Sequence, residues 1–146
     1  MAQDRFRPHA AAYLVLVKDG QVLLHQRANT NYYDGYYSLV AGHLEGGETA
    51  EQCVVREALE EAGITLDLKD LKVEHVLHFL TPTHEYIDIF VTASKWQGEI
   101  RNMEPEKCGE LRWTPLDNLP DNLVPEVRQA LDRISKGEHY SEIGWE

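Results

Sequence analysis

Residues 42–64 read GHLEGGETAEQCVVREALEEAGI, and this stretch concentrates acid in a chain whose formal net charge is already −11. Its glutamates are Glu45, Glu48, Glu51, Glu57, Glu60 and Glu61. Thr49 followed three residues later by Gln52 is a capping-box pattern, which predicts that a helix begins here. Good helix formers continue to Ala62, and Gly63 is a typical helix stop. The last three glutamates therefore lie close together on one predicted helix.

That predicted helix has an acidic side and an apolar side. At 100° per residue, Glu57, Glu60 and Glu61 fall within an arc of about 100°. The neighbouring side is apolar and contains Ala50, Val54, Val55, Ala58 and Ala62. Like charges at this spacing cost a few tenths of a kcal/mol per pair, and Arg56 is the only basic residue of the helix. Three glutamates on an arbitrary helix most often form a solvated face, so context must decide whether they bind anything.

The loop before the helix supplies that context. Residues 42–48 contain Gly42, Gly46 and Gly47, and a glycine backbone can approach a ligand or a metal closely. Hard divalent cations prefer oxygen ligands, and Mg²⁺ in particular is bound by carboxylates and carbonyls while it retains several waters. We interpret the loop and the acidic side of the helix as one site, in which the acids hold cations and the cations hold phosphate.

Length and composition limit the remaining possibilities. A chain of 146 residues with 42% hydrophobic and 27% charged residues fits one folded domain, residues 1–146. The negative charge argues against broad nucleic-acid or membrane-surface binding, because a polyanion would need a bridging cation. The longest early apolar run, Ala10–Val17, is too short to span a bilayer, so we expect no export or membrane segment. Cys53 and Cys108 have no metal-ligand spacing, which favours a reducing cytoplasm.

The pattern along the chain predicts strands and two helices in one layered fold. Strands are expected near residues 10–17, 21–27, 37–41, 71–80, 86–96 and 111–113, and a second helix at 125–135. Asp19-Gly20 joins the first two strands as a tight hairpin, and Pro125 begins the last helix. This order indicates α+β or layered α/β/α packing.

The acidic stretch also resembles a known motif. Its fixed residues are Gly42, Glu48, Arg56, Glu57, Glu60, Glu61 and Gly63, in the spacing G-x5-E-x7-R-E-x-x-E-E-x-G. This is similar to a complete Nudix box, with apolar Ala58 and Ile64 where the motif has apolar residues. The resemblance implies an α/β fold, an α/β/α sandwich with a mixed β-sheet between helices. One departure is Val40, where many members of the family carry proline before the box.

The resemblance implies a Mg²⁺-dependent hydrolase, with Mn²⁺ as the alternative metal, acting on a nucleoside diphosphate linked to another moiety. Glu60 and Glu61 match the main metal-binding pair, and Glu57 matches a residue that serves as ligand or as general base. Gly42 would offer its backbone carbonyl to the metal. Metal chemistry of this kind neutralises phosphoryl oxygens and lowers the pKa of a bound water.

The remaining residues of the box and a later loop are given supporting roles by the same resemblance. Arg56 would orient the helix glutamates through salt bridges, and Glu48 would be mainly its structural partner. Members of the family often add one more acid from the loop before the last strand, where Glu104, Glu106 and Glu110 compete. We favour Glu106 as a further metal ligand.

Candidate substrate contacts lie outside the box. Arg27 ends the second predicted strand, where similar members direct arginine toward a phosphate, although an ordinary surface arginine fits equally well. Tyr37 and Ser38 end the aromatic loop NYYDGYYS, and Glu126 begins the last helix, in places that resemble base-contacting positions of the MutT-like branch. We expect Tyr37 to stack on a planar base and Glu126 to accept a hydrogen bond from it.

These observations predict cleavage of a nucleoside triphosphate, including an oxidised purine nucleotide, to monophosphate and pyrophosphate. Alternatives within the same chemistry are nucleotide sugars, ADP-ribose and dinucleoside polyphosphates. A non-catalytic nucleotide-binding regulatory module is the alternative from another class. A glycosidase also uses two carboxylates, but that chemistry explains neither the glycine-rich loop nor Arg56. We expect a monomer or a homodimer.

Overall fold

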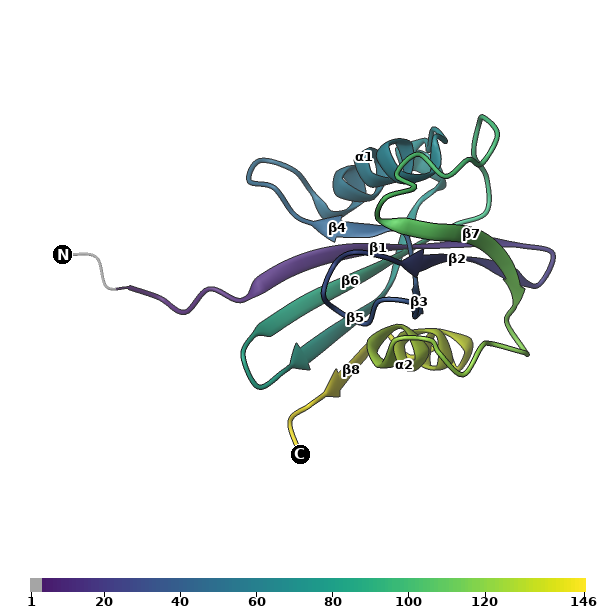
Figure 1. Ribbon diagram of the computed structural model, residues 1–146. Coiled ribbons are helices and arrows are strands. Elements are labelled where there is room, and N and C mark those ends of the chain that lie inside the picture. The colour runs from purple at the N-terminus through teal and green to yellow at the C-terminus, as the bar shows by residue number, and fades with distance from the viewer. Residues whose placement is uncertain (1–3) are drawn as a thin grey trace.

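The computed structural model describes residues 4–146, in which two helices flank a mixed β-sheet (Figure 1). The strands are β1 (His9–Lys18), β2 (Gln21–Arg27), β3 (Tyr37–Ser38), β4 (Ala41–His43), β5 (Lys72–Leu80), β6 (Glu85–Ala93), β7 (Cys108–Pro115) and β8 (Tyr140–Ile143). The helices are α1 (Ala50–Ala62) and α2 (Pro125–Ser135), with a short 3₁₀ turn at Leu68–Asp70. Within residues 4–146, no helix combines the length and apolar character needed to cross a membrane.

The sheet is organised around β1. Its strand order is β3-β2-β1-β6-β5-β8, with β4 paired to β1 and β7 paired to β2. β1 runs parallel to β6 and antiparallel to both β2 and β4. The β1–β2 hairpin turns at Asp19 and Gly20, whose φ angles of 53° and 75° are the positive values that a primed turn requires. β1 therefore pairs with β4, the strand in which the acidic stretch begins, and also with β2 and β6.

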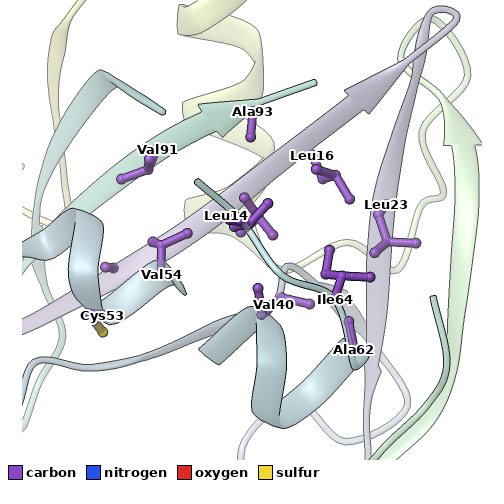
Figure 2. Packing of buried hydrophobic residues seen from close by; sticks show 13 residues of the cluster. Leu14, Leu16, Leu23, Val40, Cys53, Val54, Ala62, Ile64, Val91 and Ala93 are labelled. Atoms are coloured by element: carbon purple, nitrogen blue, oxygen red, sulfur yellow. The ribbon is translucent and has the colours of Figure 1, made fainter. Parts of the chain in front are cut away.

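Alternate residues of β1 fill two cores, one on each side of the sheet. Leu14 and Leu16 pack with Val54 of α1 and Ile64, and Figure 2 shows this first core. Val15 instead joins the second core, which is shared with α2. In Figure 1, α1 and α2 lie on opposite sides of the strands, as this alternation requires. The predicted sandwich is confirmed.

The segments differ in how closely the structure matches their predicted bounds. Both helices begin and end as predicted. The strand expected at residues 37–41 is divided into β3 and β4, and the one expected at 111–113 extends to all of β7. β8 was not predicted, because its sequence YSEI is short and mixed in polarity. It forms by pairing in parallel with β5, and the His75 ring Nε2 lies 2.7 Å from the Ser141 hydroxyl.

Candidate active site

Local sequence positions the acidic helix over the glycine-bearing loop. Thr49 and Gln52 form the complete capping box, and Gly63 ends α1 in the left-handed conformation with a φ of 69°. β4 pairs with β1 and places Gly42 beneath the helix. A Cβ at this position would overlap the carboxyl group of Glu57. Glycine therefore lets the loop backbone approach Glu57 without displacing its carboxyl group.

Arg56 holds the carboxylates of this region together. Its Nη2 donates to Glu48 Oε1 at 2.8 Å and its Nη1 to Glu57 Oε1 at 2.6 Å. The same Nη1 lies 3.4 Å from Glu60 Oε2 and 3.5 Å from Glu45 Oε1. Hydrogen bonding to Arg56 lowers the pKa of Glu48 to about 2. The arginine thus compensates the like charges that the sequence places on one helix face.

Glu61 lies deeper and has no comparable partner. It is buried, and its Oε2 has no hydrogen-bond partner within residues 4–146. Its Oε1 is 3.4 Å from His25 Nε2, but burial lowers the pKa of His25, so this contact is not a strong ion pair at neutral pH. Burial, then a hydrogen bond with Glu57 and its charge, raise the pKa of Glu61 to about 10. Such a carboxyl favours a bound proton or a cation.

The loop before β7 contributes Glu104 to this cluster, not the residue favoured from the sequence. Glu104 lines the cleft described below, and burial together with the charges of Glu57 and Glu106 raises its pKa against the opposing effect of Lys107. Glu106 does not line the cleft, and its backbone carbonyl accepts from Asn29 Nδ2 at 2.6 Å. The backbone turns at residues 104–108, so Glu104 lies in the cleft and Glu106 lies outside it.

The residues present fit a divalent cation. Glu57, Glu60 and Glu61 project from α1 into one cleft together with Gly42 and Glu104. All offer oxygen, the donor that Mg²⁺ and Mn²⁺ prefer, and Glu61 Oε2 is free. Within the described part of the chain, no three His, Cys, Asp or Glu side chains already have the arrangement of a complete metal site. A metal ion held by this cluster would therefore need a different arrangement of these side chains.

The cleft has a volume of about 940 Å³ and extends from the acidic cluster to a second polar region. Arg27, Ser38 and Glu126, three of the predicted substrate contacts, line it. Residues that sequence reasoning did not select also line it, among them Tyr13, Tyr32 and Asp88. One continuous hollow thus joins the candidate metal site to the candidate substrate site.

Arg27 fixes the aromatic loop at the side of the cleft. Its Nε donates to the backbone carbonyl of Tyr32 at 2.6 Å, and its Nη2 donates to Thr30 Oγ1 at 3.1 Å. Its guanidinium also lies 5.1 Å from the centre of the Tyr32 ring. Arg27 is therefore a loop anchor as well as a cleft residue.

Tyr37, the tyrosine expected to stack on a base, does not lie in the cleft. Tyr37 is 6% exposed, packs in the α2-side core and does not line the cleft. Its hydroxyl donates to Glu110 at 2.6 Å, and Arg112 lies over its ring. β3 turns Tyr37 inward toward the core. Tyr32 of the same loop does line the cleft, as do Tyr13, Phe79 and Tyr86.

Two buried acids form the far end of the cleft. Asp88 of β6 is 1% exposed and Glu126 of α2 is 4% exposed. Neither oxygen of Asp88 has a hydrogen-bond partner in residues 4–146, and the same holds for Glu126 Oε1. Glu126 Oε2 accepts from the Tyr32 hydroxyl at 3.2 Å. Burial and then the charge of Glu126 raise the pKa of Asp88 to about 8, and burial also raises that of Glu126.

Asp88 was missed because it lies in the strand pattern YIDIFV, where an isolated acid normally faces solvent. A signal was nevertheless present. Asp88 has the same parity as Phe90, and Phe90 is fully buried and stacks with Tyr13 at a ring-centre distance of 4.5 Å. An acid on the core-facing side of a central strand is a candidate functional residue.

Comparison with known proteins agrees with this geometry. The NUDIX domain family matches residues 5–134. The NAD-capped RNA hydrolase NudC of Chromobacterium violaceum is 36% identical over 129 residues, which cover 84% of this chain and 46% of that protein. NudC of Stutzerimonas stutzeri is 35% identical over 120 residues, which cover 82% of this chain and 40% of that protein. The chain spans about half the length of the curated relatives it matches.

Solved structures show the same fold. The MutT NUDIX hydrolase from Burkholderia pseudomallei has a TM-score of 0.80 and 29% identity, covering 87% of this chain and 98% of that one. The MutT protein from Methanosarcina mazei Go1 has a TM-score of 0.77 at 20% identity, and the match covers 91% of this chain and 97% of that one. The second likeness concerns the fold alone.

Proposed function

The chain belongs to the NUDIX family, and from that premise we propose that it is a divalent-metal-dependent hydrolase of phosphoanhydride bonds in nucleotides. The substrates that we propose first are nucleoside triphosphates, which it would cleave to monophosphate and pyrophosphate. The observation that carries the proposal is the single cleft that is lined both by the α1 acids and by the pair Asp88 and Glu126. One end suits a metal-bound phosphate chain, and the other suits a ring with N–H groups.

The proposal assigns roles to the acids of the cleft and to Arg56. Nudix hydrolases generally use a divalent metal, typically Mg²⁺, which when bound neutralises phosphoryl oxygens and lowers the pKa of a coordinated water. Glu57, Glu60 and Glu61 would hold that metal with the Gly42 carbonyl, and Glu104 takes the place predicted for Glu106. One of the helix carboxylates accepts the proton of the attacking water. Arg56 keeps these carboxylates together while the substrate enters.

A dinucleotide is the second candidate substrate. The names of the two curated relatives describe hydrolysis of NAD-capped RNA, and the cleft volume of about 940 Å³ lies near the upper end for small-molecule sites. Against a capped RNA stands the net charge of −11, which repels a long phosphate backbone. A free dinucleotide such as NAD carries much less of that charge.

The test is a hydrolysis screen with purified protein. Nucleoside triphosphates, nucleotide sugars, ADP-ribose, dinucleoside polyphosphates and NAD are each incubated with Mg²⁺ or Mn²⁺, and products are separated by chromatography. We expect turnover of at least one nucleoside triphosphate and complete loss of turnover in excess EDTA. Full activity in EDTA, with bound metal shown to be negligible, would contradict the metal assignment. Turnover confined to NAD would favour the dinucleotide as substrate. No turnover of any of these compounds would favour a regulatory module.

A further inference from the structure

We propose that Asp88 reads the base of the bound nucleotide, and that it selects a ring presenting two parallel N–H groups, as guanine does with N1–H and its 2-amino group. This inference rests on the proposed function, because it takes the ligand of the cleft to be a nucleotide. Its structural basis is a carboxylate at the far end of the cleft with both oxygens unused.

The burial of Asp88 calls for a ligand. A polar group that is 1% exposed and has no partner costs free energy, and most buried carboxylates in proteins are hydrogen-bonded for that reason. Asp88 lines the cleft, but both of its oxygens are covered, so a ligand reaches them only after a side chain that covers them moves. Its strand neighbours do not satisfy it, because Ala11 lies opposite on β1 and Leu77 opposite on β5. The missing hydrogen-bond donors must come from a ligand or from water.

The two free oxygens define the donor pattern. Burial favours the protonated form of Asp88 in the free protein, but two N–H donors stabilise the ionised form, so a ligand that offers them displaces the proton. The ionised carboxylate only accepts, and it binds most strongly to two parallel N–H groups, as in its bidentate pairs with arginine. Among the standard neutral bases, only guanine offers two adjacent N–H groups on one edge. Adenine and cytosine place an amino group beside a ring acceptor, and uracil places its single N–H between two carbonyls. The pattern at Asp88 therefore favours guanine.

Neighbouring residues complete this recognition site. Glu126 Oε1 also lacks a partner, so it can accept the second hydrogen of the 2-amino group. Its other oxygen is held by the Tyr32 hydroxyl, which fixes the carboxylate. Tyr13 and Tyr32 line the cleft beside these acids and provide flat apolar surface for a planar ring.

The experiment measures binding without turnover. Nucleoside monophosphates contain no phosphoanhydride bond, so calorimetric titration of GMP, IMP, XMP, AMP, CMP and UMP in the presence of Mg²⁺ reports recognition alone. IMP differs from GMP by loss of the 2-amino group, and XMP carries a carbonyl in its place. For the wild-type protein, we expect GMP to bind about 10- to 100-fold more tightly than IMP, because one hydrogen bond to a buried charged acceptor is lost.

A swap of preference is the sharper test. Asp88→Asn replaces one acceptor oxygen by an amide donor of nearly equal size, so the variant should bind XMP more tightly than GMP. Asp117→Asn, an exposed substitution in the turn after β7, should keep the wild-type preference. Thermal unfolding of both variants verifies folding. If Asp88→Asn does not fold, the wild-type series decides the proposal.

The outcomes separate this proposal from the proposed function. Equal affinity of the wild-type protein for GMP and IMP, or binding of none of the six monophosphates, overturns the role of Asp88 in base selection. An Asp88→Asn variant that is folded and keeps the wild-type order also overturns it. Selective GMP binding without hydrolysis of any nucleotide overturns the proposed hydrolase and leaves the base site standing.

Discussion

Two groups of carboxylates face one cleft, and the protein holds them in opposite ways. On α1, the guanidinium of Arg56 lies within 4 Å of four glutamates. At the far end, three of the four oxygens of Asp88 and Glu126 have no hydrogen-bond partner in residues 4–146. Most of the first group contacts a cation, whereas the second group has one hydrogen bond, from the Tyr32 hydroxyl to Glu126.

The difference shows that acid content by itself does not identify a metal site. A cluster that a permanent arginine holds together can exchange some of those contacts for metal ions while its overall charge stays tolerable. Buried acids without any cation are better suited to neutral N–H donors, which satisfy the oxygens without adding charge. The following predictions, ordered by expected effect, test whether the two groups differ in this way.

The largest effect is expected from Glu61→Gln at the metal-binding end. Loss of the ligand charge should lower kcat about 100-fold or more. Stability without metal should hold or rise at pH 7.5. The raised pKa of Glu61 means that folding favours its protonated form, and glutamine removes this cost. Steady-state kinetics and urea unfolding in EDTA measure the two effects.

The matched control is Glu51→Gln, in the first turn of the same helix and outside the cleft. It should leave kcat near the wild-type value. If Glu61→Gln kept the wild-type kcat at limiting Mg²⁺, Glu61 would not be a metal ligand. The distinction between the two acid groups would then lose its main support.

Removal of the internal cation should have a smaller effect, on stability. Arg56→Gln leaves Glu48 and Glu57, whose side chains are 15% and 13% exposed, without their main partner. We expect the free energy of unfolding in EDTA to fall by about 2 kcal/mol, below the range for fully buried pairs because Arg56 is itself partly exposed. Urea unfolding measures it, with Arg101→Gln as an exposed control. An unchanged unfolding free energy would show that Arg56 does not compensate these charges.

The smallest effect concerns pH and the second group of acids. Burial raises the pKa of Asp88 to about 8, so the folded state holds a proton that the unfolded state releases near pH 4. This contribution to stability is full below pH 4 and is lost as the pH rises toward 8. Asp88→Asn should therefore reduce the loss of stability between pH 5 and pH 8 in EDTA, by on the order of 1–2 kcal/mol.

Urea unfolding at the two pH values measures this difference, and Asp117→Asn should retain the wild-type dependence. An identical pH dependence in Asp88→Asn and wild type would mean that Asp88 is solvated in the free protein. The contrast between the two acid groups would then be lost.

Much of the fold and of the metal-binding end could be predicted from the sequence because local rules determine them. The capping box, the turn at Asp19 and Gly20 and the period of α1 depend on neighbours in the chain. The fixed spacing around Arg56 also places the acids on one helix face. These features need no knowledge of distant segments.

In the other part of the cleft, Glu126 was predicted from the family resemblance, but Asp88 and Tyr32 were not, because this part is assembled from distant segments. Asp88, Glu126 and Tyr32 come from β6, α2 and the loop after β2, and their contact depends on the order of strands in the sheet. Tyr37 and Glu106 lie outside the cleft for a related reason. Adjacent tyrosines or glutamates look equivalent in sequence, and the local backbone decides which one faces the cleft.

β4 and β6, two of the three strands that pair with β1, both carry residues that line the cleft. Ala12 of β1 pairs with Gly42 on one side, and Ala11 pairs with Asp88 on the other. Strands in a sheet lie about 4.8 Å apart, so the backbones of the metal-binding loop and of β6 are separated by about 10 Å across a single strand. β1 thus keeps the two segments in fixed relative positions, because both are hydrogen-bonded to the same strand.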